Sequence, residues 1–308
     1  MIVPPDMDIA EAGGALCSIE AERVTGFGSQ TVEEMLAVEE PLEIQLGYGS
    51  AQSRAVKSIS VTMRTPGNDF ELAAGFLMTE GVVRDVNEIE RIAYAAVGNI
   101  KGLTDTAAGR TAMPYRPTNN VVRVDLSADV TVSLSNLERN FYTTSSCGIC
   151  GKASLLALRS VCPPRRRNTF SISAETLYTL PNRLREAQRV FNRTGGLHAA
   201  GLFDADGELL ALREDVGRHN AVDKLLGEEF LADRTPLSEC LLLLSGRASF
   251  ELLQKGLMGG ISMVVSVGAP SSLAVQVARE FDITLVGFLR DSHFNVYHGA
   301  SHVTGLSP

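Results

Sequence analysis

Leu241-Leu242-Leu243-Leu244, followed at once by Ser245-Gly246-Arg247, is the stretch that decides the fold. Four consecutive apolar residues that end at a glycine-containing turn predict a strand whose two faces are both covered. Two similar runs follow, from Met263 to Val267 and from Ile283 to Phe288, and a helix is predicted between each pair of runs. Buried strands that alternate with helices are typical of an α/β fold.

The residues before this stretch extend the same pattern. A helix is predicted near residues 175–192, followed by strands at 200–203 and 208–212 around the Asp206-Gly207 turn. The resulting order, α-β-β-α-β-α-β-α-β, predicts a three-layer α/β domain with a mixed sheet over residues 169–308. This architecture resembles the cytidine deaminase fold.

Deaminases of that class hold zinc through His-x-Glu at one helix start and Pro-Cys-x-x-Cys at the next. The corresponding helix starts in this chain read Asp215-Val216-Gly217-Arg218-His219-Asn220 and Ser245-Gly246-Arg247-Ala248-Ser249. Because the zinc ligands are absent, we do not expect deamination.

The first half of the chain predicts a smaller β-rich (α+β) domain over residues 34–142. Residues 38–46 and 58–64 alternate polar and apolar side chains as half-buried strands do, and a helix is predicted just after Asp69. We expect a mobile tail over residues 1–33, where Pro, Gly and acidic residues show no sustained periodicity. Residues 143–168 are predicted to be a cysteine loop and a linker.

Composition limits the classes of function. The chain has 308 residues and a net charge of -8, so it has no overall basic field with which to hold nucleic acid. The first residues carry no basic signal-peptide region, and no apolar run reaches the length of a membrane span. Five cysteines at irregular spacing do not form a disulfide framework. We therefore expect a cytoplasmic protein that contacts neither membrane nor nucleic acid.

Cys147-Gly148-Ile149-Cys150-Gly151 carries the most distinctive chemistry in the chain. A Cys-x-x-Cys pair supports a redox dithiol, half of a zinc site, or a thiolate that carries sulfur as a persulfide. A zinc site needs two further ligands at fixed spacing, which the neighbouring sequence lacks, so no structural metal is expected. A helix that starts just after Cys150 and a nearby cation, Lys152, favour a reactive thiolate.

The two helix starts at Arg218 and Arg247 are candidate anion sites, because backbone amides at a helix N-terminus and guanidinium groups both bind phosphate. The alternative is that these arginines form surface ion pairs, for example with Asp215 or Glu251. The segment after residue 287 turns polar at a strand end, where α/β sheets bind ligands, and would form a second wall of the pocket.

Together, these motifs resemble the FdhD family of formate dehydrogenase accessory sulfurtransferases over about residues 36–300. The resemblance rests on five segments in a fixed order. They are Cys147-Gly148-Ile149-Cys150-Gly151, Thr194-Gly195-Gly196-Leu197-His198-Ala199-Ala200, Glu214-Asp215-Val216-Gly217-Arg218-His219-Asn220-Ala221-Val222-Asp223-Lys224, Ser245-Gly246-Arg247 and Phe294-Asn295-Val296-Tyr297.

The resemblance implies an enzyme that accepts sulfur from a cysteine desulfurase as a persulfide. It would pass the sulfur to the molybdenum cofactor, bis(molybdopterin guanine dinucleotide), before that cofactor enters formate dehydrogenase. Cys147 matches the persulfide cysteine, and Cys150 matches a second thiol that assists transfer. GDP is expected to mimic the bound cofactor. The residues expected to bind it are Phe288, Leu289, Arg290, Asp291, Ser292 and His293, with Arg218, His219, Ser245, Gly246 and Arg247 from the helix starts.

The partners implied are the desulfurase, the catalytic subunit of formate dehydrogenase and a second copy of the chain in a homodimer. Two other classes of function stay open at this point. One is a non-catalytic chaperone that binds and delivers the finished cofactor, and the other is a thioredoxin-like oxidoreductase with a reversible Cys147–Cys150 disulfide.

Overall fold

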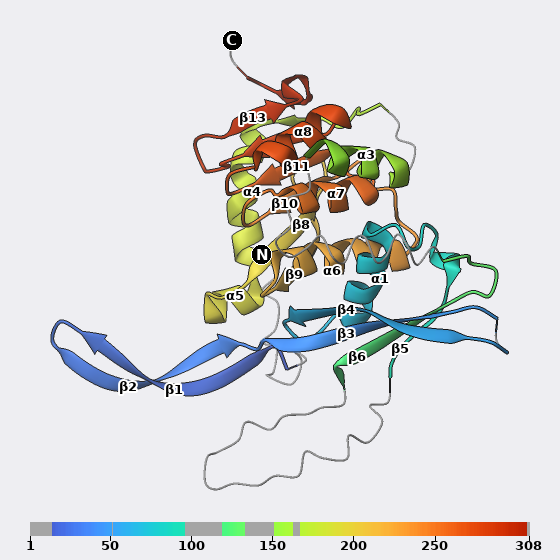
Figure 1. The fold of residues 1–308 in the computed structure, drawn as a ribbon. Helices are drawn as coiled ribbons and strands as arrows, with labels where there is room; N and C mark the ends of the chain where they lie inside the picture. Colours follow the sequence, from blue (N-terminus) through green and yellow to red (C-terminus); the bar gives the residue numbers. More distant parts are fainter. Residues whose placement is uncertain (1–13, 51, 96–118, 133–150, 163–166, 307–308) are drawn as a thin grey trace, which may run out of the picture.

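A six-stranded mixed sheet forms the centre of the second half of the chain (Figure 1). The structure is a computed structural model that describes residues 14–50, 52–95, 119–132, 151–162 and 167–306. The strand order is β13-β12-β11-β10-β8-β9. The bounds of these strands are β8 His198–Phe203, β9 Leu209–Asp215, β10 Leu241–Leu244, β11 Met263–Ser266, β12 Thr284–Gly287 and β13 Asn295–His298.

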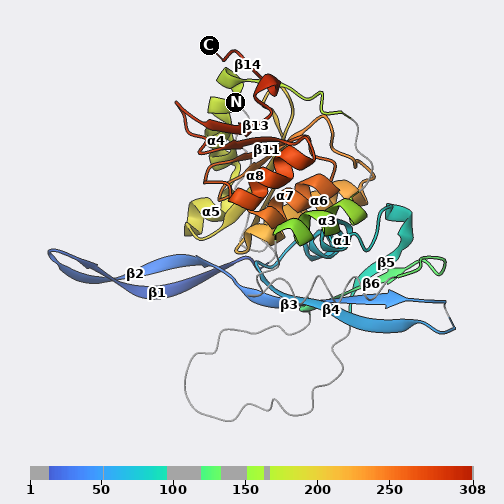
Figure 2. The ribbon, with the colours of Figure 1, turned by 45° about the horizontal axis from the view of Figure 1, so that its top comes forward.

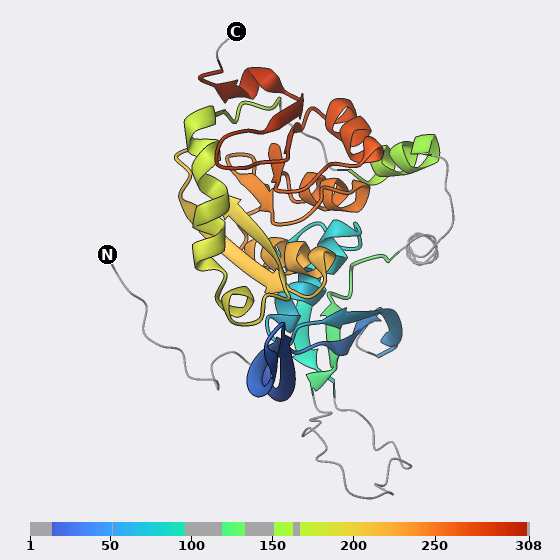
Figure 3. The ribbon, with the colours of Figure 1, turned by 90° about the vertical axis from the view of Figure 1, so that its left-hand side faces the viewer.

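Helices cover both faces of this sheet, as apolar strands require. On β10, Leu241 and Leu243 belong to a core that includes α4, whereas Leu242 and Leu244 belong to a core that includes the helices of the other face. Figure 3 shows α4 on one side of the sheet and α7 and α8 on the other. The helix bounds are α4 Ala174–Ala187, α5 Arg189–Thr194, α6 Arg218–Leu231, α7 Phe250–Met258 and α8 Ser272–Glu280.

The prediction of a mixed α/β fold is confirmed, and the helices and strands predicted after residue 170 occur in the predicted order. Three strands, at residues 172–173, 295–298 and 303–304, were not predicted. One predicted helix differs: the segment near 175–192 divides at Gln188, where α4 ends and α5 begins. The division into domains depends in part on residues outside the described ranges and stays a prediction.

A second sheet, of order β4-β3-β6-β5, lies beside α1 and is joined to the six-stranded sheet through one continuous core. Helices α1 and α6 cross with their backbones in close approach: a Cβ on Gly75 would lie 1.9 Å from the carbonyl oxygen of Asp223, and a Cβ on Gly227 would lie 1.9 Å from that of Glu71. The bounds are β3 Glu40–Tyr48, β4 Ala55–Arg64, α1 Asp69–Thr79, the 3-10 turn η1 Val86–Glu88, β5 Ile89–Tyr94 and β6 Val121–Leu126.

The N-terminal region contains a hairpin that sequence reasoning did not predict. Strands β1 Leu16–Thr25 and β2 Gly28–Ala37 pair antiparallel over ten residues each and project beyond the rest of the described chain (Figures 1 and 2). The region was expected to be a mobile tail because its apolar residues do not alternate clearly. A ribbon with both faces exposed to solvent leaves no such pattern.

The remaining elements are short, apart from the helix α3 Gly151–Val161, which begins immediately after Cys150 as predicted. Strands β7 Ile172–Ser173 and β14 Val303–Thr304 pair with each other, and a 3-10 turn, η3 Ala300–His302, precedes β14. Within the described ranges, no helix is long and apolar enough to cross a membrane.

Candidate anion-binding edge of the central sheet

The predicted cofactor-binding residues come from loops that meet at one edge of the six-stranded sheet. Strands β10, β11 and β12 are parallel, so their carboxyl ends lie together. The backbone amide of Gly268, after β11, donates to the carbonyl of Gly246, after β10, at 2.8 Å. The amide of Phe288, after β12, donates to the carbonyl of Gly268 at 3.0 Å. Three loops from distant parts of the sequence therefore form one continuous surface.

The α6 helix start reaches the same edge because β8 runs antiparallel to β10 and β9 antiparallel to β8. His198, the first residue of β8, is paired with Asp215, the last residue of β9, and α6 begins three residues later at Arg218. A Cβ on Gly246 would lie 3.4 Å from Nδ1 of His198, so the histidine ring lies against the loop after β10. The structure thus brings the two predicted helix starts together.

Arg218 and Arg247 are available for a ligand. Neither guanidinium has a hydrogen bond or an ion pair with any residue that the structure describes, and Nε of Arg218 is buried without a partner. The alternative of an ion pair with Asp215 or Glu251 is not observed: neither arginine lies within ion-pair distance of these carboxylates, and Asp215 is paired with Lys224 at 2.7 Å. Unpaired guanidinium groups beside two helix N-termini form a surface suited to phosphate.

A fully buried carboxylate fixes the α6 helix start. Asp215 is completely buried and accepts hydrogen bonds from the amides of Thr65 and Gly217, at 3.1 and 2.8 Å, and from the Asn220 side chain at 3.1 Å. Lys224, which is also buried, donates to the carbonyl of Thr65 at 2.7 Å. Because Thr65 directly follows β4, this network ties the anion-binding edge to the first half of the chain.

Two histidines near the arginines are held neutral. Burial, reinforced by the positive charges of Lys255 and Arg218, lowers the pKa of His219 to about 4. Burial and Arg218 also lower the pKa of His198, although the carboxylate of Asp215 opposes this shift. At neutral pH both rings therefore offer a hydrogen-bond acceptor rather than a positive charge.

The segment 288–293 contributes to the edge unevenly. Phe288 is exposed and has a positive φ of 55°, a backbone conformation rarely adopted by a residue with a side chain. The side chain of Leu289 is fully buried in the core, whereas the guanidinium of Arg290 donates to the carbonyls of Val267 and Leu289 at 2.6 and 2.9 Å. Exposed side chains follow at Asp291, Ser292 and His293.

Helices α1, α6 and α7 enclose a buried ionic network that the sequence did not single out. Lys255 of α7 lies 2.9 Å from the carboxylate of Asp223 and donates to the hydroxyl of Thr79 at 3.0 Å, and the same hydroxyl donates to Asp223 at 2.8 Å. Burial raises the pKa of Asp223 to about 6, although Lys255 opposes that shift. The signal in the sequence that could have identified this network is a charged residue on the buried face of a predicted helix.

The predicted catalytic cysteines, Cys147 and Cys150, lie outside the described residues. Of the other cysteines, Cys17, Cys162 and Cys240 are not in disulfide bonds. Burial, helped by the negative charge of Glu229, raises the pKa of Cys240 to about 11, which disfavours a reactive thiolate there.

A cavity of about 790 Å³ lies elsewhere, at the amino ends of β10 and β11, away from the predicted cofactor residues. Its lining includes Met78, Val161, Pro236, Met258 and Ser262. None of the predicted site residues lines it.

These observations define an α/β protein with a candidate anion-binding edge on its central sheet and a Cys-x-x-Cys pair just before α3 in the sequence. Comparison with known proteins gives its family: residues 37–304 match the FdhD/NarQ family, and the chain belongs to it. The sulfur carrier protein FdhD of Streptomyces coelicolor is 49% identical over 283 residues, which cover 91% of this chain and 93% of that protein. The sulfur carrier protein FdhD of Mycobacterium tuberculosis is also 49% identical, over 89% of this chain and 93% of that protein.

A solved structure shares the fold. The crystal structure of a formate dehydrogenase accessory protein from Desulfotalea psychrophila superposes with a TM-score of 0.66 at 21% sequence identity. The match covers 94% of this chain and 99% of that one. The arrangement of the sheets described above is therefore shared with that protein.

Proposed function

We propose that this protein is a sulfurtransferase that carries sulfur to the molybdenum cofactor required by formate dehydrogenase. The observation that carries the proposal is near-half identity, along almost the whole chain, to proteins named sulfur carrier protein FdhD. The Cys147-Gly148-Ile149-Cys150 segment supplies the chemistry that a sulfur carrier needs.

Sulfur is accepted through thiol exchange in this proposal. The thiolate of Cys147 attacks the outer sulfur of a persulfide on a cysteine desulfurase, and a new sulfur–sulfur bond forms as the donor's own bond breaks. The donor leaves as a thiolate, and the transferred sulfur keeps its proton. This exchange needs no external oxidant or reductant.

Release of the sulfur uses the second cysteine. The thiolate of Cys150 attacks Sγ of Cys147, a Cys147–Cys150 disulfide forms, and the carried sulfur leaves as hydrosulfide with the two electrons that the cysteines lose. Hydrosulfide and one proton then replace an oxo ligand of the molybdenum substrate, and that oxygen leaves as water. A cytoplasmic dithiol reductant returns the cysteines to their thiol form.

The anion-binding edge would hold the guanine dinucleotide part of this substrate. The unpaired guanidinium groups of Arg218 and Arg247 and the adjacent helix starts suit its diphosphates. Exposed Phe288 and the polar residues up to His293 form the neighbouring wall. Arg290 already binds two carbonyls, so we expect it to shape the wall rather than to grip phosphate.

Several wider features belong to the same proposal. The C-terminal part would be a cytidine-deaminase-like domain that has lost the zinc ligands, and the chain would act as a cytoplasmic homodimer. Its partners would be the desulfurase and the catalytic subunit of formate dehydrogenase.

The test of sulfur transfer is intact-protein mass spectrometry after incubation with an active cysteine desulfurase and cysteine. We expect a gain of about 32 Da that Cys147→Ala abolishes and that Cys150→Ala retains. Cys240→Ala is the matched control and should gain sulfur like the wild type, because the raised pKa of Cys240 keeps it protonated. Absence of the gain in the wild type would contradict a sulfur carrier.

The same variants separate the other two classes of function. A chaperone that only delivers the cofactor would support formate dehydrogenase maturation with Cys147→Ala, whereas a sulfurtransferase would not. A thioredoxin-like oxidoreductase would reduce unrelated disulfides, an activity that we do not expect.

Cofactor binding is tested with GDP by isothermal titration calorimetry. Each of Arg218→Ala and Arg247→Ala should weaken GDP binding by at least about tenfold, since a hydrogen bond to a charged group contributes about 1.5–3 kcal/mol. Arg159→Ala, which removes an arginine paired with Glu280 away from this edge, should leave the affinity unchanged.

A further inference from the structure

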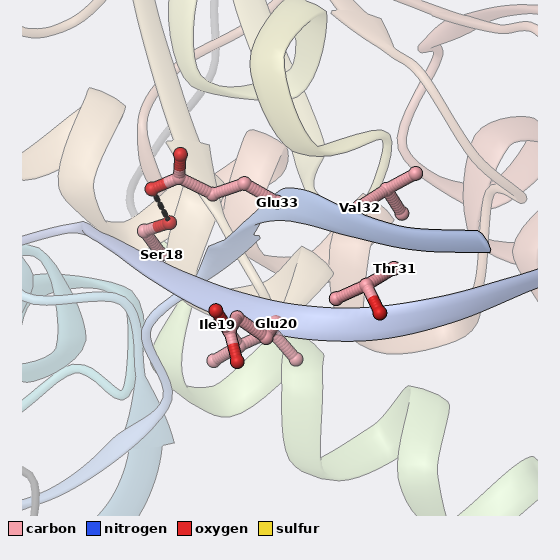
Figure 4. Close-up of a pocket in the computed structure, with 6 residues that line it drawn as sticks. All are labelled: Ser18, Ile19, Glu20, Thr31, Val32 and Glu33. Atoms are coloured by element: carbon pink, nitrogen blue, oxygen red, sulfur yellow. Dashed lines mark hydrogen bonds between the residues drawn. The ribbon is translucent and has the colours of Figure 1, made fainter.

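The cavity of about 790 Å³ at the amino ends of β10 and β11 has the dimensions of a small-molecule site, for which about 300–1,000 Å³ is usual. Its floor is formed by Met78, Val83, Leu257 and Met258, which are at most 9% exposed. The hollow of about 450 Å³ on the β1–β2 hairpin, by contrast, is lined only by exposed and half-buried side chains (Figure 4). The cavity with the buried floor is therefore the better candidate for a ligand.

The floor of this cavity is aliphatic. The half-buried side chain of Val161, on α3, extends the surface made by the four floor residues. None of the described residues that line the cavity is aromatic, so a nucleobase or other flat ring would have nothing on which to stack. Two of the floor residues are methionines, whose unbranched side chains adapt to the shape of an apolar neighbour. These features suit a flexible aliphatic chain.

The backbone around the floor does not favour an ion. Met78 and Met258 lie in the last turns of α1 and α7, where free carbonyls could bind a cation. The carbonyl of Met78, however, accepts from the amide of Gly81, and the carbonyl of Leu257 accepts from that of Gly260, both at 3.0 Å. The partial negative charge at helix carboxyl ends also opposes an anion on the floor. An uncharged part of a ligand belongs there.

The rim of the cavity carries the opposite preference. Arg84 and Arg167 are exposed, and neither guanidinium has a hydrogen bond or an ion pair with any residue in the described ranges. Glu239 is the other charged residue of the lining and is paired with neither arginine. Two positive charges and one negative charge leave the lining with a net charge of +1, although the whole chain carries -8. Free guanidinium groups bind carboxylates, and a net charge of one matches a single carboxylate.

We propose that this cavity binds an unbranched aliphatic carboxylate, with the chain on the apolar floor and the carboxylate at Arg84 and Arg167. The hydroxyl groups of Thr169 and Ser238, which also line the cavity, are placed to donate further hydrogen bonds to the carboxylate. The site uses no residue of the candidate anion-binding edge and does not depend on the proposed sulfur transfer.

Isothermal titration calorimetry of the full chain with decanoate, kept below the concentration at which it aggregates, tests the proposal. We expect one saturable site per chain. Hexanoate should bind about a hundredfold more weakly, because it buries four fewer methylene groups. Decanol should bind at least about tenfold more weakly than decanoate, because it carries no charge for the arginines. The proposal is overturned if decanoate shows no saturable binding or if decanol binds as tightly.

Variants place the head group. Each of Arg84→Ala and Arg167→Ala should weaken decanoate binding by at least about tenfold, and the exposure of both side chains means that the fold should be kept, as circular dichroism will show. Arg193→Ala is the matched control, because it removes an exposed arginine of α5 that does not line the cavity. Arg218→Ala, which should weaken GDP binding, should leave decanoate binding unchanged. Wild-type affinity in both cavity variants would overturn the assignment.

Hydrogen exchange measured by mass spectrometry locates the bound chain without any substitution. Decanoate should slow exchange at residues 237–239 and 258–262, which border the cavity, and leave residues 245–249 and 288–293 unchanged. Protection confined to the β1–β2 hairpin, where Phe27 is fully exposed, would mean that decanoate adsorbs to another apolar surface, and would overturn the proposal. Sulfur transfer to Cys147 is measured separately, so either proposal can fail without the other.

Discussion

Replacing Lys224 by Met should destabilise the protein by about 3–5 kcal/mol, the usual cost of removing one partner of a buried ion pair. The Asp215 carboxylate is completely buried, and Nζ of Lys224, 2.7 Å away, supplies its positive counterpart. Without that charge, Asp215 keeps only the three hydrogen bonds from Thr65, Gly217 and Asn220. The carbonyl of Thr65 also loses its hydrogen bond from Lys224, which adds about 1 kcal/mol.

The assay is guanidinium unfolding followed by circular dichroism, with free energies of unfolding compared at equal slope. The double variant Asp215→Asn, Lys224→Met removes both charges and should lose less than Lys224→Met alone, with a coupling of about 2 kcal/mol. The exposed pair of Arg183 and Glu208 has the same 2.7 Å separation, so Arg183→Met is the control and should cost at most about 1 kcal/mol. If Lys224→Met and Arg183→Met lower the free energy of unfolding by equal amounts, the argument from burial is refuted.

Three further predictions concern packing, pH and the thiols. Gly75→Ala should cost about 3 kcal/mol or more, because its Cβ would overlap the carbonyl of Asp223 in α6, whereas Gly26→Ala, with open space around it, should change the free energy of unfolding by less than about 0.5 kcal/mol. The lowered pKa of His219 means that its protonation opposes folding, so its stability contribution is complete above pH 6.5 and is lost as the pH falls towards 4, by up to about 3 kcal/mol. His219→Gln should flatten that part of the stability curve. If the variant keeps the pH dependence of the wild type, folding does not lower the pKa of His219. Alkylation by iodoacetamide at pH 7 should modify Cys147 before Cys240, as read by peptide mass spectrometry, because burial raises the pKa of Cys240.

Sequence reasoning assigned the candidate anion-binding residues to one edge of the sheet through features that are local in the chain. Apolar runs such as Leu241–Leu244 have only one favourable environment, the interior of a covered sheet, and the polar turn after each run marks its carboxyl end. Because helices connect these strands, the strands run parallel, and their carboxyl ends lie at the same edge of the sheet. The helix starts near Arg218 and Arg247 could therefore be assigned to one edge from the sequence.

The contacts that fix this edge were not predictable from the sequence, because they join residues far apart in the chain. The hydrogen bond from the Thr65 amide to Asp215 spans 150 positions, and that from Lys255 to Thr79 spans 176. A lysine or aspartate in a helical pattern normally indicates a solvated face. Only the packing of α1 and α6 shows that these charges are buried and paired.

The β1–β2 hairpin illustrates the same limit for a whole element. Its sequence lacks a hydrophobic face because each strand is exposed on both sides, and β-strand formation there depends on cross-strand pairing rather than on burial. The sequence by itself determined the order of the α/β elements, the cysteine pair and the family, since these are written in short-range patterns and motifs. The tertiary structure alone decided which charges are buried, which arginines are left unpaired and where the β1–β2 hairpin points, because each depends on the distances between segments that folding brings together.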